Sequence, residues 1–175
     1  LAPLSEAERI GFETGDIEFA QIAATTRCVN GFMVGQDLNT LEANFQSKNT
    51  RASEFNQTPM LSMGLIFQQS IRHLMTTTEN PSMISGELYD EVECIPLHVR
   101  DKDYSSMTSL YVLKTFVAVL FREHDRSYEY ALTARKSLKS LISSPAVPFF
   151  VLFESLAYVA QMRKASPLQL LTLRF

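Results

Sequence analysis

Between residues 107 and 141, the spacing of the hydrophobic positions predicts two helices joined by a short polar turn. Apolar side chains recur at three- and four-residue steps through residues 107–121, which is the period of an α-helix. The polar turn 122–125 follows. Residues 127–141 then alternate small side chains with large ones, which lets two helices approach closely. We therefore expect a central hairpin with helices at 110–121 and 127–141.

Start and stop signals predict further helices before this hairpin. Ser5 with Glu8 three residues later has the pattern of a capping box, so a first helix should start there and end near Gly15. Asp16 then predicts the start of a second helix. Gly35 is suited to end that helix in the left-handed conformation, because glycine has no Cβ to clash.

Asp37 can cap a third helix that begins at Leu38. Thr58 as N-cap and Pro59 as the first helical residue predict a fourth, because proline lacks only an N–H that would be unpaired there. A clear loop follows at residues 80–86, since proline at position 81 cannot continue a helix.

The remaining stretches predict short helices and no sheet. A helix at 87–94 should end before Pro96, and a last helix should begin at Pro148 and run to about Ala160. No segment alternates polar and apolar residues with the period of two that indicates a strand. The chain is therefore expected to be all-α, one region of antiparallel helix hairpins spanning residues 1–175. Residues 166–175 match no pattern that we can assign.

Composition narrows the class of protein. The 175 residues are 46% hydrophobic and 20% charged, which suffices for a folded core, and the net charge of −3 provides no basic stripe for nucleic acid. The longest apolar run is about a dozen residues, against the ~20 of a membrane span. Cys28 and Cys94 are interpreted as buried thiols. We expect a cytoplasmic region without nucleic-acid or membrane partners. Because the chain begins at Leu1, we interpret it as an internal fragment.

Two segments of similar sequence suggest an internal repeat. Residues 15–20 (GDIEFA) align with residues 122–127 (REHDRS), and each segment follows one helix and opens another. The second lies 107 residues further along, about three units of a 34-residue helix-pair repeat. A tight turn followed by a small side chain is what two closely packed helices require. Ala20 is thus expected where the first two helices cross, with Ser127 as its counterpart.

A wider pattern resembles one family. It comprises segment 15–20, Cys28, segment 32–35 (FMVG), Leu38, segment 41–42 (LE), segment 89–91 (YDE) and segment 96–98 (PLH). This pattern resembles the tetratricopeptide-like helical region of large signalling proteins, over most of residues 15–161. The resemblance implies a right-handed helical superhelix that follows protein-kinase-like and ATPase domains and precedes GAF and histidine-kinase modules. It brings no catalytic residues, because the family's kinase and ATPase motifs lie outside this region.

Motifs for catalysis are scarce. The phosphate-binding loop and the protein-kinase signatures are absent from the sequence. His124 lacks the surroundings of a phosphorelay histidine. Asp90, Glu91 and Glu93 form one acidic cluster, which could hold Mg²⁺ but is expected to be a solvated helix face. We expect no catalytic, cofactor-binding or metal-binding residue and no cofactor, so the region itself should not be an enzyme.

Cysteine–histidine pairs and a ligand-binding surface are further candidate sites. Cys28 or Cys94 beside His73 or His98 could form a thiol–imidazole pair, but core packing is the favoured interpretation. Met60, Met63 and Met75 could form an adaptable binding surface, although methionine more often fills gaps in a core. Five tyrosines could line a concave groove, or pack helix pairs with their hydroxyls at the rim: Tyr104, Tyr111, Tyr128, Tyr130 and Tyr158.

Three functions follow from these observations. The first is a non-catalytic helical scaffold or interdomain regulatory module in a signalling kinase or ATPase, with neighbouring domains or other proteins as partners. The second is a sensor domain that holds a small ligand or a peptide in its concave face, which a pocket of ~300–1,000 Å³ would favour. The third is a small helical enzyme that uses a metal at residues 90–93.

Overall fold

The computed structural model describes residues 2–76, 79–141 and 144–164, and these residues are mainly helical. Their elements are α1 (Ala2–Thr14), α2 (Ile17–Met33), α3 (Leu38–Glu54), α4 (Thr58–Met75), α5 (Glu91–Asp101), α6 (Tyr104–Leu120), α7 (His124–Ser137), the 3₁₀ turn η1 (Leu138–Leu141) and α8 (Ala146–Lys164). In these ranges the only β pairing is an isolated bridge between Ser85 and Asp90. The all-α prediction is confirmed. The apolar stretch 168–175 lies outside the described residues.

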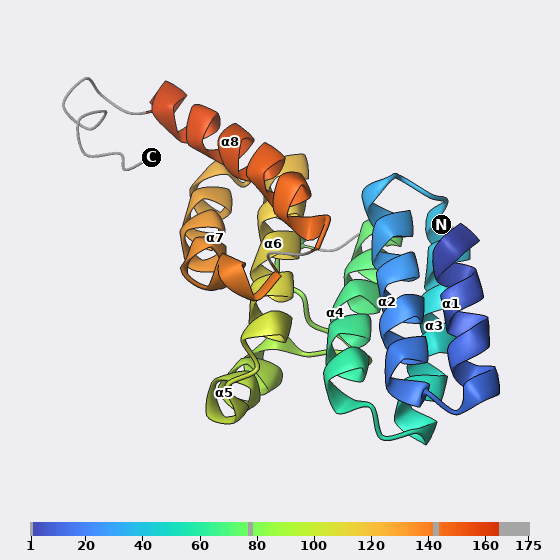
Figure 1. Cartoon of the computed structure of the whole chain (residues 1–175). Coiled ribbons are helices and arrows are strands. Elements are labelled where there is room, and N and C mark those ends of the chain that lie inside the picture. Colours follow the sequence, from blue (N-terminus) through green and yellow to red (C-terminus); the bar gives the residue numbers. More distant parts are fainter. Residues whose placement is uncertain (1, 77–78, 142–143, 165–175) are drawn as a thin grey trace.

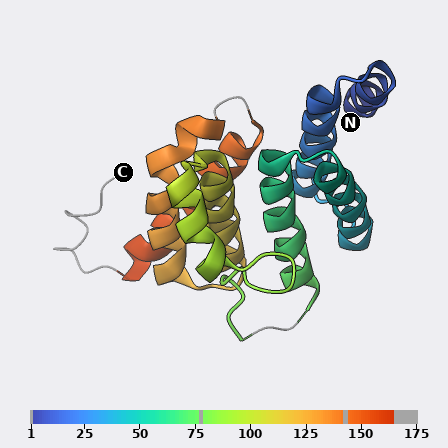
Figure 2. The ribbon, with the colours of Figure 1, turned by 90° about the horizontal axis from the view of Figure 1, so that it is seen from below.

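Neighbouring helices pack as hairpins that form two halves. α1 pairs with α2, α3 with α4, and α6 with α7, while α8 packs on both α6 and α7. Figure 1 shows α1 to α4 side by side in one half and α6 to α8 in the other. Seen from below in Figure 2, α4 is the helix of the first half that lies nearest the second. Its contacts with α6 join the two halves.

Four of the turns between helices share one backbone conformation. A residue with positive φ ends each preceding helix, at +79° for Gly15, +54° for Asn56, +56° for Lys102 and +60° for Arg122. The next residue caps the following helix, with φ between −86° and −78° and ψ between 66° and 73°. The turns at segments 15–20 and 122–127 are therefore equivalent in backbone, although only one of them has glycine.

Small side chains lie where the paired helices cross. Ala20 is fully buried, and a Cβ built on Gly11 would lie 2.8 Å from the Ala20 Cβ. Gly11 precedes Gly15 by four residues, and Ala118 precedes Arg122 by the same interval. Ala118 and Ser127 are also fully buried. The predicted position of Ala20 at the crossing of α1 and α2 is confirmed.

Aromatic rings join the two halves in the core. Phe32 of α2 lies 5.6 Å, ring centroid to ring centroid, from Phe67 of α4 and equally far from Phe116 of α6. Phe149 of α8 is 6.3 Å from Phe32 and 5.2 Å from Phe116. Phe45 of α3 stacks on Phe67. One aromatic cluster therefore draws side chains from α2, α3, α4, α6 and α8.

The start of the first helix was predicted wrongly. Helix α1 already includes Ala2, so Ser5 lies inside the helix and does not act as its N-cap. Pro3 allows this early start, because proline fits the first turn of a helix, where its missing N–H has no partner to lose. The predicted end near Gly15 is confirmed, as is the role of Gly35 as a left-handed residue after α2.

The helix around Pro96 was also placed wrongly. Helix α5 runs from Glu91 to Asp101 and contains Pro96, whereas the sequence predicted a helix at 87–94 that ended before it. The Asp90 carboxylate accepts the backbone N–H of Val92 at 2.8 Å and therefore fixes the later start. Pro96 removes one backbone donor, and the helix continues beyond it. Residues 98–101 thus form the last turn of α5.

The central hairpin is present with shifted boundaries. Helix α6 begins at Tyr104, six residues before the predicted start, because the Asp103 side chain accepts the Ser106 backbone N–H. Helix α7 begins at His124, and the last turn of the predicted second helix is the 3₁₀ turn η1. Helix α8 begins at Ala146, so Pro148 lies within its first turn, where proline is tolerated.

Candidate functional site

An apolar groove lies where the two halves of the molecule meet, and we call it the junction groove. Its enclosed part has a volume of about 150 Å³. A shallower hollow of about 370 Å³ shares five of its lining residues, so the two are continuous. The lining of the enclosed part comes from α2, α4, α6 and the connection into α8: Ile22, Thr25, Thr26, Val29, Asn30, Met60, Met63, Phe67, Ser109, Leu141, Ser144 and Ala146.

The helix periods place these side chains on the groove. Phe67 belongs to the buried face of α4, whereas Met63, one turn earlier, and Met60, two turns earlier, are only half-buried. Phe67 is also part of the aromatic cluster, so the floor of the groove is continuous with the contacts that hold the halves together. Anything bound in the groove would touch both halves.

The polar atoms of the groove are few. Thr25 donates its hydroxyl to the Gln21 backbone oxygen at 2.8 Å. The Asn30 Oδ1 atom is buried and has no hydrogen-bond partner among the described residues. A buried acceptor without a donor costs about 1–3 kcal/mol. The lining of the groove is mainly apolar, so the groove is suited to an apolar group.

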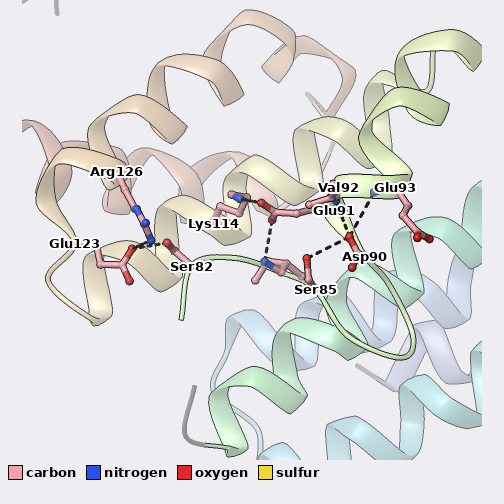
Figure 3. Close-up of polar contacts among 10 residues, drawn as sticks. Ser82, Ser85, Asp90, Glu91, Val92, Glu93, Lys114, Glu123 and Arg126 are labelled. Atoms are coloured by element: carbon pink, nitrogen blue, oxygen red, sulfur yellow. Dashed lines mark hydrogen bonds and ion pairs between the residues drawn. The ribbon is translucent and has the colours of Figure 1, made fainter. Parts of the chain in front are cut away.

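The acidic cluster at residues 90–93 is divided among three tasks (Figure 3). Asp90 caps α5, Glu91 points toward Lys114 of α6, and Glu93 lies on the exposed surface. No group of three or more histidine, cysteine, aspartate or glutamate side chains that could hold a metal ion occurs within the described ranges. The three carboxylates do not converge, and only Glu93 fits the predicted solvated face.

Glu91 and Lys114 form a buried ion pair. Their side chains are 12% and 4% exposed. The second Glu91 oxygen accepts the Ile84 backbone N–H at 2.8 Å, and the Lys114 ammonium lies 4.5 Å from the centre of the Tyr130 ring. Each charge therefore has two polar or aromatic neighbours, as a charge removed from water requires.

The loop at residues 80–86, which contains Ile84, is also held by Ser82. This fully buried serine donates its hydroxyl to the Glu123 carboxylate, which also pairs with Arg126 at 3.2 Å (Figure 3). Glu123 is the cap residue of α7, so the contact ties the loop to the turn of the α6–α7 hairpin. The loop predicted at residues 80–86 is therefore anchored to α6 and α7 by side-chain contacts.

Lys48 is a buried cation that we did not identify as a candidate site residue. Its side chain is almost wholly buried, and it donates to Asn49 Oδ1 at 2.9 Å and to the Met60 backbone oxygen. No carboxylate forms an ion pair with it in the described part of the chain. Burial lowers the pKa of Lys48 to about 8. Its spacing after Leu41 and Phe45 already placed it on the apolar face of α3.

A chain of side-chain hydrogen bonds leads from Lys48 to the surface. Asn49 donates to Gln68 at 2.8 Å, and Gln68 donates to Glu42 at 2.9 Å. Glu42 also pairs with Arg72. The hydrogen bond from Gln68, followed by that from Arg72, holds the pKa of Glu42 below its usual range. These contacts link α3 to α4 and give the buried side chains of Lys48, Asn49 and Gln68 hydrogen-bond partners.

The cysteines and histidines play separate roles. Cys28 and Cys94 are free thiols, and burial raises the pKa of Cys28, which disfavours the reactive thiolate. His73 Nε2 contacts the Ser85 backbone oxygen at 2.9 Å. His98 Nδ1 lies 3.2 Å from the Asp103 carboxylate. Cys28 lies in the core, so its predicted burial is confirmed, whereas Cys94 is only half-buried and packs against the core.

The methionines and tyrosines are spread over the molecule. Met60 and Met63 line the junction groove, whereas Met75 is exposed at the far end of α4. The five predicted tyrosines do not line its enclosed part. Four of them pack in pairs, Tyr111 with Tyr130 and Tyr128 with Tyr158, which agrees with helix packing. His124 opens α7 and is half-buried.

Comparisons with known proteins leave the family unidentified. No protein-family description, curated protein or solved structure matches this chain. Within the described residues, every helix is too short or too polar to cross a membrane. The class that the fold defines is an all-helical domain packed as hairpin pairs.

Proposed function

We propose that this protein is a non-catalytic helical module that binds an apolar protein segment in the junction groove. The observation that carries the proposal is the position of the groove, which is lined by residues of both halves and lies against the aromatic cluster that joins them. The segment belongs to a neighbouring domain of the same chain or to another protein, so the module acts as a scaffold or as an interdomain regulator.

The four equivalent turns support a repeat origin. Gly15, Asn56, Lys102 and Arg122 have the same left-handed conformation before a helix cap, which is the arrangement that stacked helix hairpins need. Together with the resemblance of segment 15–20 and its companions, these turns support our proposal that the module is a tetratricopeptide-like region of a signalling kinase or ATPase, with its hairpins wound as a right-handed superhelix. In this setting the kinase and ATPase chemistry belongs to other domains.

The position of the groove between the two halves gives binding a way to regulate the module. A segment bound in the groove touches α2 and α4 on one side and α6 and the start of α8 on the other. Such a segment binds more tightly to one relative arrangement of the halves than to others, and it shifts their population toward that arrangement. Through that shift, docking in the groove is transmitted to elements attached at either end of the module.

The size of the enclosed part of the groove favours a peptide over a free small ligand. Sites for small molecules usually have ~300–1,000 Å³, whereas the enclosed part here has about 150 Å³. That volume suits one anchoring side chain, and the adjoining open hollow suits the rest of a segment. The sensor function remains the second candidate, and the adjoining hollow of about 370 Å³, whose volume lies within that range, favours it.

NMR signals of the methionine methyl groups test whether the junction groove binds a peptide. The probe is a neutral amphipathic helical peptide with leucines at helical spacing, added to protein labelled with ¹³C at the methionine methyl groups. We expect the signals of Met60 and Met63 to shift saturably, while those of Met75 and Met83 stay in place, because only the first two line the groove. Met60→Glu should abolish the shifts, and Met75→Glu serves as the matched control.

Indole added in the same assay separates the two functions. Saturable shifts of Met60 and Met63 with indole but not with the peptide would favour the small-ligand sensor. If neither probe moves these two signals in the folded protein, the groove is not a binding site and the proposal is wrong.

A further inference from the structure

A second groove lies between α1 and α3, which both pack on α2 (Figure 1), and we call it the α1–α3 groove. Its volume is about 530 Å³. It is separate from the junction groove, because the two share no lining residue. Its lining includes two phenylalanines, three glutamates and two arginines, so it combines aromatic rings with charged groups.

One carboxylate of the α1–α3 groove has no ion pair. Both arginines of the groove are already engaged, since Arg9 pairs with two glutamates of its own helix and Arg51 pairs with Glu8 at 3.2 Å. Glu8 also pairs with Arg27 of α2. Glu54 forms no ion pair with any described residue, although Arg51 lies one turn before it on α3. The groove therefore has an exposed carboxylate that is open to a cation from outside.

The position of Glu54 at the end of α3 also favours a cation. Glu54 is the last residue of this helix, and the C-terminal end of a helix dipole is negative and attracts positive charge. The wider charge distribution has the same sign. Residues 1–54 contain eight acidic residues and four basic ones, a net charge of −4, whereas the whole chain has −3. A surface with such an excess of one charge attracts partners of the opposite charge.

The aromatic rings of the groove suit a guanidinium group. Phe55, next to Glu54, is 45% exposed, and its ring lies 6.0 Å, centroid to centroid, from that of Phe12. Arg51 already makes this kind of contact within the molecule, since its Cζ atom lies 5.3 Å from the centre of the Phe12 ring. A planar guanidinium stacks on aromatic rings and donates hydrogen bonds to carboxylates. Phe55 and Glu54 line the same groove, so together they offer both contacts to a second arginine.

We propose that the α1–α3 groove binds a basic segment of a partner protein, through an arginine that pairs with Glu54 and stacks on Phe55. Arginine suits the site better than lysine, because its guanidinium is less strongly hydrated and stacks on rings. The groove is larger than one side chain, so the residues that flank the arginine find room in it as well. A protein segment is therefore favoured over a free small cation. This contact does not depend on the function of the junction groove.

Peptide titration of the full chain tests the contact, followed by the amide NMR signals of Phe12 and Asn56 beside the groove. The probe is a five-residue peptide with blocked ends and a central arginine between alanines. The control peptide has citrulline in place of arginine, which is neutral and has nearly the same shape. We expect the citrulline peptide to bind about tenfold more weakly. It loses the ion pair and the cation–π contact, each of which contributes about two- to fivefold at an exposed site.

Matched variants assign these two contacts to their residues. Glu54→Gln should weaken binding of the arginine peptide about two- to fivefold and leave the citrulline peptide unaffected. Glu18→Gln removes the same charge at an exposed position of α2 outside the groove, and it should weaken binding less than about twofold because salt screens distant charges. Phe55→Leu should weaken binding about two- to fivefold. Phe121→Leu, at a ring of similar exposure after α6, should have no effect.

Four outcomes would overturn the proposal. The first is the absence of saturable binding by the arginine peptide. The second is equal affinity of the arginine and citrulline peptides, which would show that no cation is recognised. The third is an equal effect of Glu54→Gln and Glu18→Gln, which would show that only the overall charge matters. The fourth is binding of N-acetylarginine amide as tight as that of the peptide, which would show a site for a free small cation.

Discussion

Gly11 of α1 and Ala20 of α2 touch so closely that a Cβ added to Gly11 would lie 2.8 Å from the Ala20 Cβ. Real Cβ atoms essentially never approach so closely, so the two helices meet at a contact that accepts no larger side chain. The crossing lies beside the first turn, whose conformation returns at three later turns of the fold.

Ala20→Leu should therefore destabilise the fold. A leucine must displace the α1 backbone at Gly11, and overpacking of this kind costs ~1–3 kcal/mol. Ala20→Lys should cost at least as much, because Ala20 is fully buried. The measurement is urea unfolding. Phe19→Leu, at the exposed neighbouring position, is the control and should change the free energy of unfolding by less than ~0.5 kcal/mol. Equal stability of both Ala20 variants and the parent would mean that α1 and α2 do not cross here.

The turn at Arg122 offers a stabilising substitution. Arg122 has φ of +60°, a conformation that costs most residues roughly 1–2 kcal/mol but costs glycine little. Arg122→Gly also increases the entropy of the unfolded chain, which offsets part of this gain. We expect a net stabilisation of up to ~1 kcal/mol in chemical denaturation, and a loss of stability for Gly15→Ala. A less stable Arg122→Gly variant would contradict the equivalence of the two turns.

Loss of one member of the buried ion pair should be costly. Glu91→Gln leaves the Lys114 ammonium buried without its carboxylate, and breaking such a pair typically costs ~3–5 kcal/mol. Glu93→Gln, two residues away in the same acidic cluster, should change stability by no more than ~0.5 kcal/mol because the residue is exposed. Thermal and urea unfolding of both variants test this. Similar losses for the two variants would contradict the division of roles within the cluster.

Lys48 should make stability depend on alkaline pH. Its pKa is about 8 in the folded protein, below the ordinary value of 10.5, because burial disfavours the charged form. Between these two values the unfolded chain binds more protons than the folded one, so the contribution of Lys48 to stability rises with pH. The full rise is on the order of 3 kcal/mol, and about half of it should be reached by pH 9.5.

The variant Lys48→Met isolates this contribution. Between pH 7.5 and pH 9.5, the free energy of unfolding of the parent should rise relative to that of the variant. Urea unfolding at each pH measures this difference. Lys136→Met removes an exposed lysine and should give parallel curves for parent and variant. Parallel curves for Lys48→Met as well would show that Lys48 titrates normally.

The all-α fold class and most helix positions were predictable from the sequence. The reason is that the spacing of apolar residues indicates which face of a helix is buried. The same local signals identified Asp16, Asp37 and Gly35, since caps and left-handed residues act within a few residues along the chain. Local signals were ambiguous at Ser5 and at Pro96. A capping pattern can also occur inside a helix, and a single proline removes only one backbone hydrogen bond.

Only the tertiary structure determined the partners of the polar residues and the place of the groove. The pairing of Glu91 with Lys114 joins residues 23 positions apart, and the contact of Ser82 with Glu123 spans 41 positions. The junction groove likewise requires α2 and α4 to meet α6 and the start of α8. Periodicity tells which side of a helix is buried, but the identity of the helix that covers it depends on how all the apolar surfaces pack together at once.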